Sequence, residues 1–192
     1  MKVLLAGESW ITEEGHTKGF THVTLCRYEE PGIPFVKTLE GLGMEVTHIP
    51  NHLAQKYFPE TVEELKQYDV VILSDITSDT LLLDPDMMFN CHIHGNRLQA
   101  IKEYVRQGGG FVMIGGYMSF AGISCCARYN MTPLRDVIPV TIMNYDDRQD
   151  TPEGVSPTIV QPDHPIMKGI HEPWPRYLGY NYVEEKPGTE VL

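Results

Sequence analysis

The chain has 192 residues, of which 42% are hydrophobic and 21% charged, and its formal net charge is −11 at pH 7. This length is enough for one domain with a substantial core. The acidic balance argues against a nucleic acid or an anionic membrane surface as partner, because both need a basic face, and no apolar run approaches the roughly 20 residues of a membrane helix.

Strands and helices are expected to alternate over the first 114 residues. Pro34 favours the start of a helix that ends at Gly43. Thr61 and Glu64 have the spacing of a capping box, and Asn96 is a good N-cap for a third helix. Short apolar runs predict strands at 2–6, 45–49, 70–73 and 111–114. This order predicts an α/β fold with a doubly wound, mainly parallel sheet and helices on both faces.

Two stretches between these elements have no clean hydrophobic period. Residues 11–30 are expected to form a long loop with room for a short strand around 23–25, and residues 77–95 form a second loop. Long loops in compact domains are often functional, and the first one starts at the expected ligand edge of the sheet.

After Gly122 the pattern is weaker. A short helix is expected at 132–137, strands at 139–143, 158–160 and 177–183, a polar turn-rich stretch at 145–157, and the start of another strand at 189–192. We therefore expect one domain over residues 1–192 that lacks a C-terminal portion.

The stretch from Gly108 to Gly122 organises the expected fold. Phe111–Ile114 is an apolar run between glycines, which is typical of a central strand of a parallel sheet. Gly115 and Gly116 then allow a sharp turn with Tyr117 at its tip. Ligands of open α/β sheets bind outside the carboxyl ends of the strands. The alternative is a glycine-rich connection with a packed tyrosine.

Three polar segments follow expected strands and predict one ligand crevice. They are Glu8-Ser9-Trp10, Ser74-Asp75 and Gly115-Gly116-Tyr117. Backbone amides after the glycines could hold an anion or an oxyanion there. The alternative is that Glu8 and Asp75 cap loops or helices.

Metal and cysteine sites are not favoured. His92 and His94 lie two residues apart, and no third ligand is evident, whereas catalytic zinc needs about three protein ligands. The four cysteines are Cys26, Cys91, Cys125 and Cys126. They lack paired zinc spacing, and none lies at a strand-to-turn elbow. Without an export signal, we expect reduced thiols and a cytoplasmic location. From the ligand spacings above, we expect no metal and no cofactor.

Several segments together resemble a known family. They are KVLLAGESW at the N-terminus, residues 48–52, YDVVILSDI, NRLQAIKEYVRQGGGFVMIGGYMSFAG, HPIMKGI and LGYN. Over nearly the whole chain the sequence resembles the putative glutamine amidotransferase family, a branch of the class I glutamine amidotransferase-like superfamily. It is similar, more loosely, to the trehalose-utilisation-like proteins. The resemblance implies a flavodoxin-like, three-layer fold.

The chain departs from the chemistry that this resemblance implies. True class I amidotransferases carry a cysteine at the elbow, which attacks the side-chain amide of glutamine with help from a histidine and a glutamate. Here the elbow reads Gly115-Gly116-Tyr117-Met118-Ser119. His164-Pro165 is followed by Ile166 where the enzymes have glutamate. Glutaminase activity by the usual mechanism is therefore not expected.

Three functions follow from these residues. The first is a domain that binds a small polar metabolite, such as a sugar or a carboxylate, beside Glu8, Ser74, Asp75 and Tyr117, as a sensor or subunit. The second is a hydrolase or other enzyme in which Tyr117 or Ser119 works with Glu8, Asp75 or His16. The third is a true glutaminase that uses an unexpected cysteine. We also expect a homo-oligomer, from the general frequency of twofold dimers.

Overall fold

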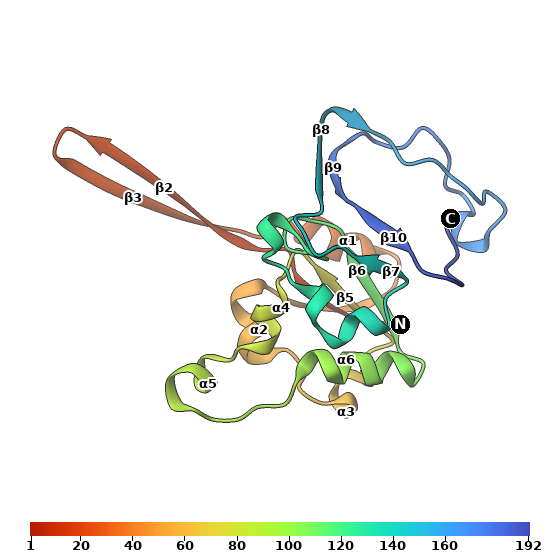
Figure 1. Ribbon diagram of the computed structural model, residues 1–192, viewed down its shortest axis with the longest axis horizontal. Helices are drawn as coiled ribbons and strands as arrows, with labels where there is room; N and C mark the ends of the chain where they lie inside the picture. The colour runs from red at the N-terminus through yellow and green to blue at the C-terminus, as the bar shows by residue number, and fades with distance from the viewer.

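The computed structural model describes residues 1–192, and its centre is a parallel sheet of four strands (Figure 1). The strands are β1 (Lys2–Gly7), β4 (Glu45–Ile49), β5 (Val70–Ser74) and β6 (Gly110–Ile114), in the order β4-β1-β5-β6. Val3 on β1 lies opposite Val46 of β4 and Val70 of β5, and Val70 also lies opposite Gly110 of β6, so β1 and β5 are the inner strands. The expected α/β fold with a doubly wound parallel sheet is confirmed.

Helices cover both faces of this sheet because successive side chains of β1 point to opposite faces. The helices are α1 (Ile33–Gly41), α2 (Asn51–Tyr57), α3 (Val62–Leu65), α4 (Ser78–Leu82), α5 (Pro85–Asn90) and α6 (Arg97–Arg106). Val3 and Leu5 pack against α1, whereas Leu4 and Ala6 belong to the larger cluster that includes residues of α2, α3, α4 and α6. The sheet therefore forms the middle of three layers.

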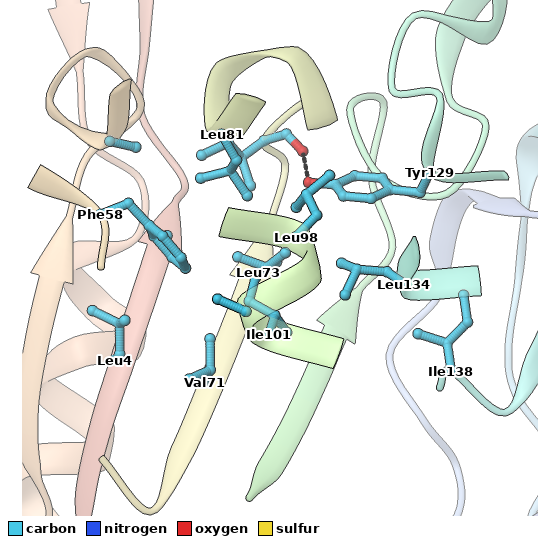
Figure 2. Packing of buried hydrophobic residues seen from close by; sticks show 14 of the residues in the cluster. Leu4, Phe58, Val71, Leu73, Leu81, Leu98, Ile101, Tyr129, Leu134 and Ile138 are labelled. Carbon is cyan, nitrogen blue, oxygen red and sulfur yellow. Dashed lines mark hydrogen bonds between the residues drawn. The ribbon is translucent and has the colours of Figure 1, made fainter. Parts of the chain in front are cut away.

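The larger cluster continues beyond the sheet into the segment after β6 (Figure 2). Leu4 and Val71 lie near Phe58 and Ile101, and Tyr129 and Leu134 extend the core past α6. The buried hydroxyl of Tyr129 donates a hydrogen bond to the carbonyl oxygen of Ile76 at 2.7 Å. Burial raises the pKa of this phenol, which stays protonated as a donor.

The expected helix starts at Thr61 and Asn96 are confirmed, and the helix expected from Pro34 begins one residue earlier, at Ile33, and ends at Gly41. The hydroxyl of Thr61 accepts a hydrogen bond from the backbone amide of Glu64, whose carboxylate accepts from the amide of Thr61. The Glu64 carboxylate also accepts from the amide of Glu60, and these two backbone donors, Glu60 and Thr61, are the main cause of the lowered pKa of Glu64. Asn96 caps α6 through a bond from the amide of Gln99. Each cap satisfies amides that the first helical turn leaves free.

The expected loop at 11–30 is wrong. This segment forms a long antiparallel hairpin of β2 (Trp10–Lys18) and β3 (Thr21–Glu29), which projects from the body of the molecule (Figure 1). Its strands contain four threonines, a residue type that favours extended backbone. Neither face of the hairpin is buried, so its sequence lacks the alternation of apolar and polar residues by which strands are found.

Other expectations after β5 also need correction. The expected loop at 77–95 contains the short helices α4 and α5. The strand at 111–114 is not central, because β6 is at the edge of the four-stranded sheet and Val112 on it is exposed. The apolar run between glycines indicated a strand buried on both faces. In the structure β6 is only half-buried, because the helices cover it only partly.

The last third of the chain forms small antiparallel pairs. These strands are β7 (Val140–Ile142), β8 (Arg148–Val155), β9 (Tyr177–Asn181) and β10 (Val183–Glu185), with β8 paired to β9 and β7 to β10. The turn-rich stretch at 145–157 is thus largely strand. The expected strand at 177–183 is broken at Tyr182, the expected helix at 132–137 is a 3-10 helix at Pro133–Asp136, and 158–160 and 189–192 form no strand.

None of the helices combines the length and the apolar character that crossing a membrane would require.

Candidate functional site

The segments that follow β1 and β5 are joined by hydrogen bonds at the carboxyl edge of the sheet. The amide of Glu8 donates to the carbonyl oxygen of Ser74 at 3.0 Å, and the Ser74 hydroxyl donates to the Glu8 carboxylate. Asn51 at the start of α2 ties the two segments together, because its Nδ2 donates to the carbonyl oxygens of Ser9 and Asp75 at 2.7 and 3.1 Å. The structure therefore brings together four residues predicted from the sequence, namely Glu8, Ser9, Ser74 and Asp75.

Glu8 and Asp75 have left-handed backbone conformations, with φ of 50° and 46°. Side chains other than glycine rarely take this region, and such residues cluster at functional sites. Each of the two is the first residue after its strand. This edge of the sheet is therefore the place at which the chain tolerates backbone strain.

The turn after β6 is fixed to this edge by side chains of the protein. The amide of Met118 donates to Asp75 Oδ1 at 2.8 Å, and the amide of Gly116 donates to Asn181 Oδ1 at 2.9 Å. These amides were expected to hold an anion, and they are already hydrogen-bonded within the protein. Asp75 acts here as the structural acceptor that the alternative interpretation of the sequence described.

The two glycines of the turn are required by close approach rather than by unusual φ angles. A Cβ atom on Gly116 would lie 2.8 Å from Asp75 Oδ1, and one on Gly115 would lie 3.0 Å from Asn181 Oδ1. Any other residue would push these acceptors away from the amides that they hold. The double glycine thus allows side chains from β9 and from the end of β5 to clamp the turn.

Tyr117 lines a cavity beside the turn after β6. This cavity has a volume of about 510 Å³ and lies between the turn after β6 and the strands β8 and β9. Its lining consists of Ile114, Gly115, Gly116, Tyr117, Phe120, Arg148, Gln149, Asp150, Tyr177, Leu178, Gly179, Tyr180 and Asn181. Volumes of 300 to 1,000 Å³ are usual for small-ligand sites. With 57% of its surface exposed, Tyr117 is available to a ligand.

Arg148 supplies a fixed cation to this cavity. Its guanidinium carbon lies 5.6 Å from the centre of the Tyr117 ring, within the range of a cation–π interaction. Its Nε and Nη2 each lie 2.9 Å from an oxygen of Asp146. The bonds from Arg148, and then the one from the amide of Ser124, hold the pKa of Asp146 well below its usual range. The same pair raises the pKa of Arg148.

Asp147 has no solvent exposure and holds the side chain of Asn181, which lines the cavity. Its two carboxylate oxygens accept from the amides of Ala121 and Gly122 and from Nδ2 of Asn181, all at 2.9 Å. Three donors compensate the desolvation of one buried charge. Asp147 and Asn181 were not predicted as site residues. In the sequence, Asp146-Asp147-Arg148 resembles a solvent-exposed turn. A cluster of charges within a turn-rich stretch was the available signal.

Several predicted residues lie away from this cavity. Trp10 is at the base of the hairpin, in a separate cavity of about 280 Å³. His16 is on β2, two residue pairs from the tip of the hairpin, and lies 3.3 Å from Glu14. Ser119 is only 2% exposed, and Ser9 and Ser74 are each 1% exposed. The structure therefore leaves Tyr117 as the exposed hydroxyl among the candidates.

The elbow does not have the form of a nucleophile site. Tyr117 does not have a positive φ, and a nucleophile elbow is a strained strand-to-helix turn. Residues 116–121 form turns and bends, and a 3-10 helix at Ile123–Cys125 follows instead of an α-helix. His164 caps another 3-10 helix by accepting from the amide of Ile166.

No group of three or more histidine, cysteine, aspartate or glutamate side chains is arranged to hold a metal ion. His92 and His94 bond instead to Asp86 and Glu60, at 2.5 and 3.1 Å from Nδ1. All four cysteines are free, and Cys125 and Cys126 lie beyond the elbow.

Comparisons with known proteins agree with this fold. A family model described as "Putative glutamine amidotransferase" matches residues 2–192. No curated protein sequence matches the chain. Two solved structures are similar at 41% identity, both described as cytoplasmic proteins of Salmonella typhimurium. STM3548 gives a TM-score of 0.93, with 97% of this chain and 76% of the other covered. STM1381, from strain LT2, gives 0.92, with 100% and 78% covered.

Proposed function

The chain belongs to the putative glutamine amidotransferase family, and from this premise we propose that it binds a small polar metabolite without the cysteine chemistry of the amidotransferases. The ligand occupies the cavity of about 510 Å³ beside the turn after β6. The observation that carries the proposal is the placement of Tyr117 and Arg148 together on the wall of this cavity.

The lining favours a ligand that has both an anionic group and a flat or sugar-like face. Arginine binds carboxylates through its planar fork of donors. Asp146 occupies the edge of the guanidinium formed by Nε and Nη2, which keeps Arg148 in place and leaves Nη1 as the donor for a ligand carboxylate. Tyr117, Tyr177 and Tyr180 are among the residues that line this cavity, and a tyrosine ring there offers aromatic contact area. A carboxylated sugar or a similar small acid meets both requirements.

The chemistry of a glutaminase has no support at this turn. Attack on an amide needs a nucleophile and free donors for the oxyanion. Tyr117 stands at the tip, and the amides of Gly116 and Met118 are bonded to Asn181 and Asp75. The role that we infer is that of a sensor or binding subunit built on an amidotransferase-like fold.

An acid/base enzyme is the second candidate, and the exposed phenol of Tyr117 beside Arg148 is the observation that favours it. A phenol next to a cation can exchange a proton with a bound substrate. Under this hypothesis, Tyr117→Phe abolishes turnover and leaves ligand binding within about twofold, whereas a pure binding role gives no turnover in either protein.

A cytoplasmic location is the accompanying proposal. Both similar structures are described as cytoplasmic proteins. Cys26, Cys91 and Cys126 are free and exposed, which suits a reducing compartment.

A thermal-shift screen tests the binding proposal. The panel contains glutamine, sugars, sugar acids, small carboxylates and phosphates. A ligand at about 100 times its Kd stabilises the folded state by roughly 2.7 kcal/mol. We expect a sugar acid or a small carboxylate to raise the Tm of the wild type, and Tyr117→Ala or Arg148→Gln to remove the shift.

Tyr57→Ala is the matched control, because Tyr57 has nearly the same exposure as Tyr117 and lies on α2, outside the cavity. A ligand whose shift persists in Tyr117→Ala and Arg148→Gln binds elsewhere, and the proposal is then wrong. Release of ammonia from glutamine by the wild type would also contradict it.

A further inference from the structure

Arg148 and Asp150 are the two charged residues that line the cavity beside Tyr117. Both belong to β8 and are two positions apart, so their side chains leave the same face of the strand. Opposite them on β9 lie Asn181 and Gly179, which also line the cavity. One face of this strand pair therefore carries both charges of the lining.

This face of the strand pair is the one that looks toward the turn after β6. From it the side chain of Asn181 reaches the Gly116 backbone at 2.9 and 3.2 Å. The guanidinium of Arg148 lies 5.6 Å from the centre of the Tyr117 ring. Asp150 shares this face by the strand register. The fold thus places a cation and an anion on one wall of the cavity.

Gly179 leaves the carboxylate of Asp150 uncovered. A Cβ atom on Gly179 would lie 3.7 Å from Asp150 Oδ1 and 2.8 Å from the carbonyl oxygen of Gln149. The carboxylate therefore lies over the glycine, where any other residue would place its side chain as a cross-strand neighbour. Without that neighbour, the carboxylate is open to a molecule in the cavity.

The two charges of the lining differ in how the protein compensates them. Nε and Nη2 of Arg148 bond to the carboxylate of Asp146, which neutralises most of this pair. Asp150 is exposed, and no ion pair or hydrogen bond within the chain holds its carboxylate. The bonds to Asp146 are the main cause of the raised pKa of Arg148, and the negative charge of Asp150 adds to it. Asp150 is thus close to Arg148 and still lacks a partner.

A ligand with a carboxylate alone would leave this wall with too much negative charge. It can bind the free Nη1 of Arg148. Asp146 and Asp150, however, already set two negative charges against the one positive charge of Arg148. Like charges repel more strongly in a partly enclosed cavity than in water. A positive group on the same ligand would remove this excess.

We propose that Asp150 selects a ligand that carries an ammonium group beside its carboxylate. Arg148 binds the carboxylate through Nη1, and Asp150 accepts hydrogen bonds from the ammonium group. This inference rests on the binding proposal above and names the ligand class within it, which is a small zwitterion such as an amino sugar acid.

The spacing of the two residues agrees with such a ligand. Residues two apart on a strand have Cα atoms about 7 Å apart. The groups that Arg148 and Asp150 bind must therefore lie close together on the ligand. A carboxylate and an ammonium group on neighbouring carbons meet this requirement.

Two sugar acids that differ in one group test the inference. D-glucosaminate has an ammonium group at C2 where D-gluconate has a hydroxyl, and the two are otherwise alike. In titration calorimetry of the intact chain, we expect the wild type to bind D-glucosaminate about fivefold or more tightly than D-gluconate. Asp150→Asn keeps the shape of the side chain without its charge, and we expect it to reduce this preference below about twofold.

Asp163→Asn is the matched control, because Asp163 is an exposed carboxylate outside the cavity and its replacement removes the same charge. It is expected to keep the preference of the wild type. Equal affinities of the wild type for the two sugar acids would overturn this inference and leave the binding proposal standing. A preference that persists in Asp150→Asn, or that falls equally in both variants, would also overturn it. If neither sugar acid binds, the sugar-acid ligand of the binding proposal is wrong, and this inference fails with it.

Discussion

The side chain of Asn181 hydrogen-bonds both polar groups of the Gly116 backbone. Its Oδ1 accepts from the Gly116 amide at 2.9 Å, and its Nδ2 donates to the Gly116 carbonyl oxygen at 3.2 Å. One amide side chain on β9 thus pairs with the turn after β6 as a neighbouring strand would. The last third of the chain is attached in this way to the carboxyl edge of the parallel sheet.

Replacing Asn181 by alanine removes this attachment. The change deletes both bonds to the half-buried Gly116 backbone and the bond to the fully buried Asp147 carboxylate. We expect the free energy of unfolding to fall by about 2 kcal/mol, measured by urea denaturation. Asn90→Ala, which removes an exposed bond to Asp86, is the control and is expected to cost less than about 0.5 kcal/mol. Equal losses would show that the attachment contributes nothing specific.

Asp147 is predicted to be the most sensitive acidic residue of the region. Asp147→Ala leaves two buried backbone amides and one side-chain donor without an acceptor. We expect a loss of about 3 kcal/mol or more in the free energy of unfolding. The exposed Asp150, three residues along on β8, is the control. A loss below 1 kcal/mol for Asp147→Ala would contradict the hydrogen-bond network described here.

The turn glycine and a helix glycine should respond in opposite ways to alanine. A Cβ at Gly116 would lie 2.8 Å from Asp75 Oδ1, so Gly116→Ala is expected to cost about 1 to 3 kcal/mol. A Cβ at Gly41 meets no atom within 4 Å, and alanine favours the helix α1. Gly41→Ala should therefore raise the Tm, whereas Gly116→Ala lowers it. A neutral Gly116→Ala would mean that Asp75 can move without loss.

The Asp146–Arg148 pair predicts part of the acid sensitivity. The folded-state pKa of Asp146 lies below its unfolded value of about 3.9, so the unfolded chain binds more protons as the pH falls. The stability from this pair is therefore fully present above about pH 4 and is lost at lower pH. In urea titrations between pH 6 and 2, the wild type should lose stability more steeply than Asp146→Asn. Parallel curves would show that this carboxylate is not tied to Arg148 in the folded state.

The capping box of α3 gives a local prediction. Thr61→Ala removes the acceptor for the Glu64 amide, and we expect a loss of about 1 kcal/mol in thermal or urea unfolding. Thr61→Ser keeps the hydroxyl and should recover most of this loss. If serine were as damaging as alanine, the methyl group and not the hydrogen bond would be the important part.

Local signals, namely apolar runs and helix caps, were enough to predict the parallel sheet and its helices from the sequence. The runs Val70–Leu73 and Phe111–Ile114 are extended and apolar, and Thr61 and Asn96 satisfy the amides of the helices that they start. Each of these signals is decided within a few residues. The meeting of Glu8 with Ser74 also followed, because carboxyl ends of neighbouring parallel strands share one edge.

The hairpin of β2 and β3 and the cavity beside Tyr117 could not be predicted from local sequence patterns. The hairpin at 10–29 has no buried face, so its residues lack the alternation that identifies most strands. Tyr117 and Arg148 lie 31 positions apart in the sequence and meet only because Asn181 and Asp147 fix the turn from a distant strand pair. The sequence by itself determined the sheet and the absence of an elbow cysteine. Only the tertiary structure decided which side chains line the cavity. Its lining comes from residues 114–120, 148–150 and 177–181, and the sequence does not show that these distant segments meet.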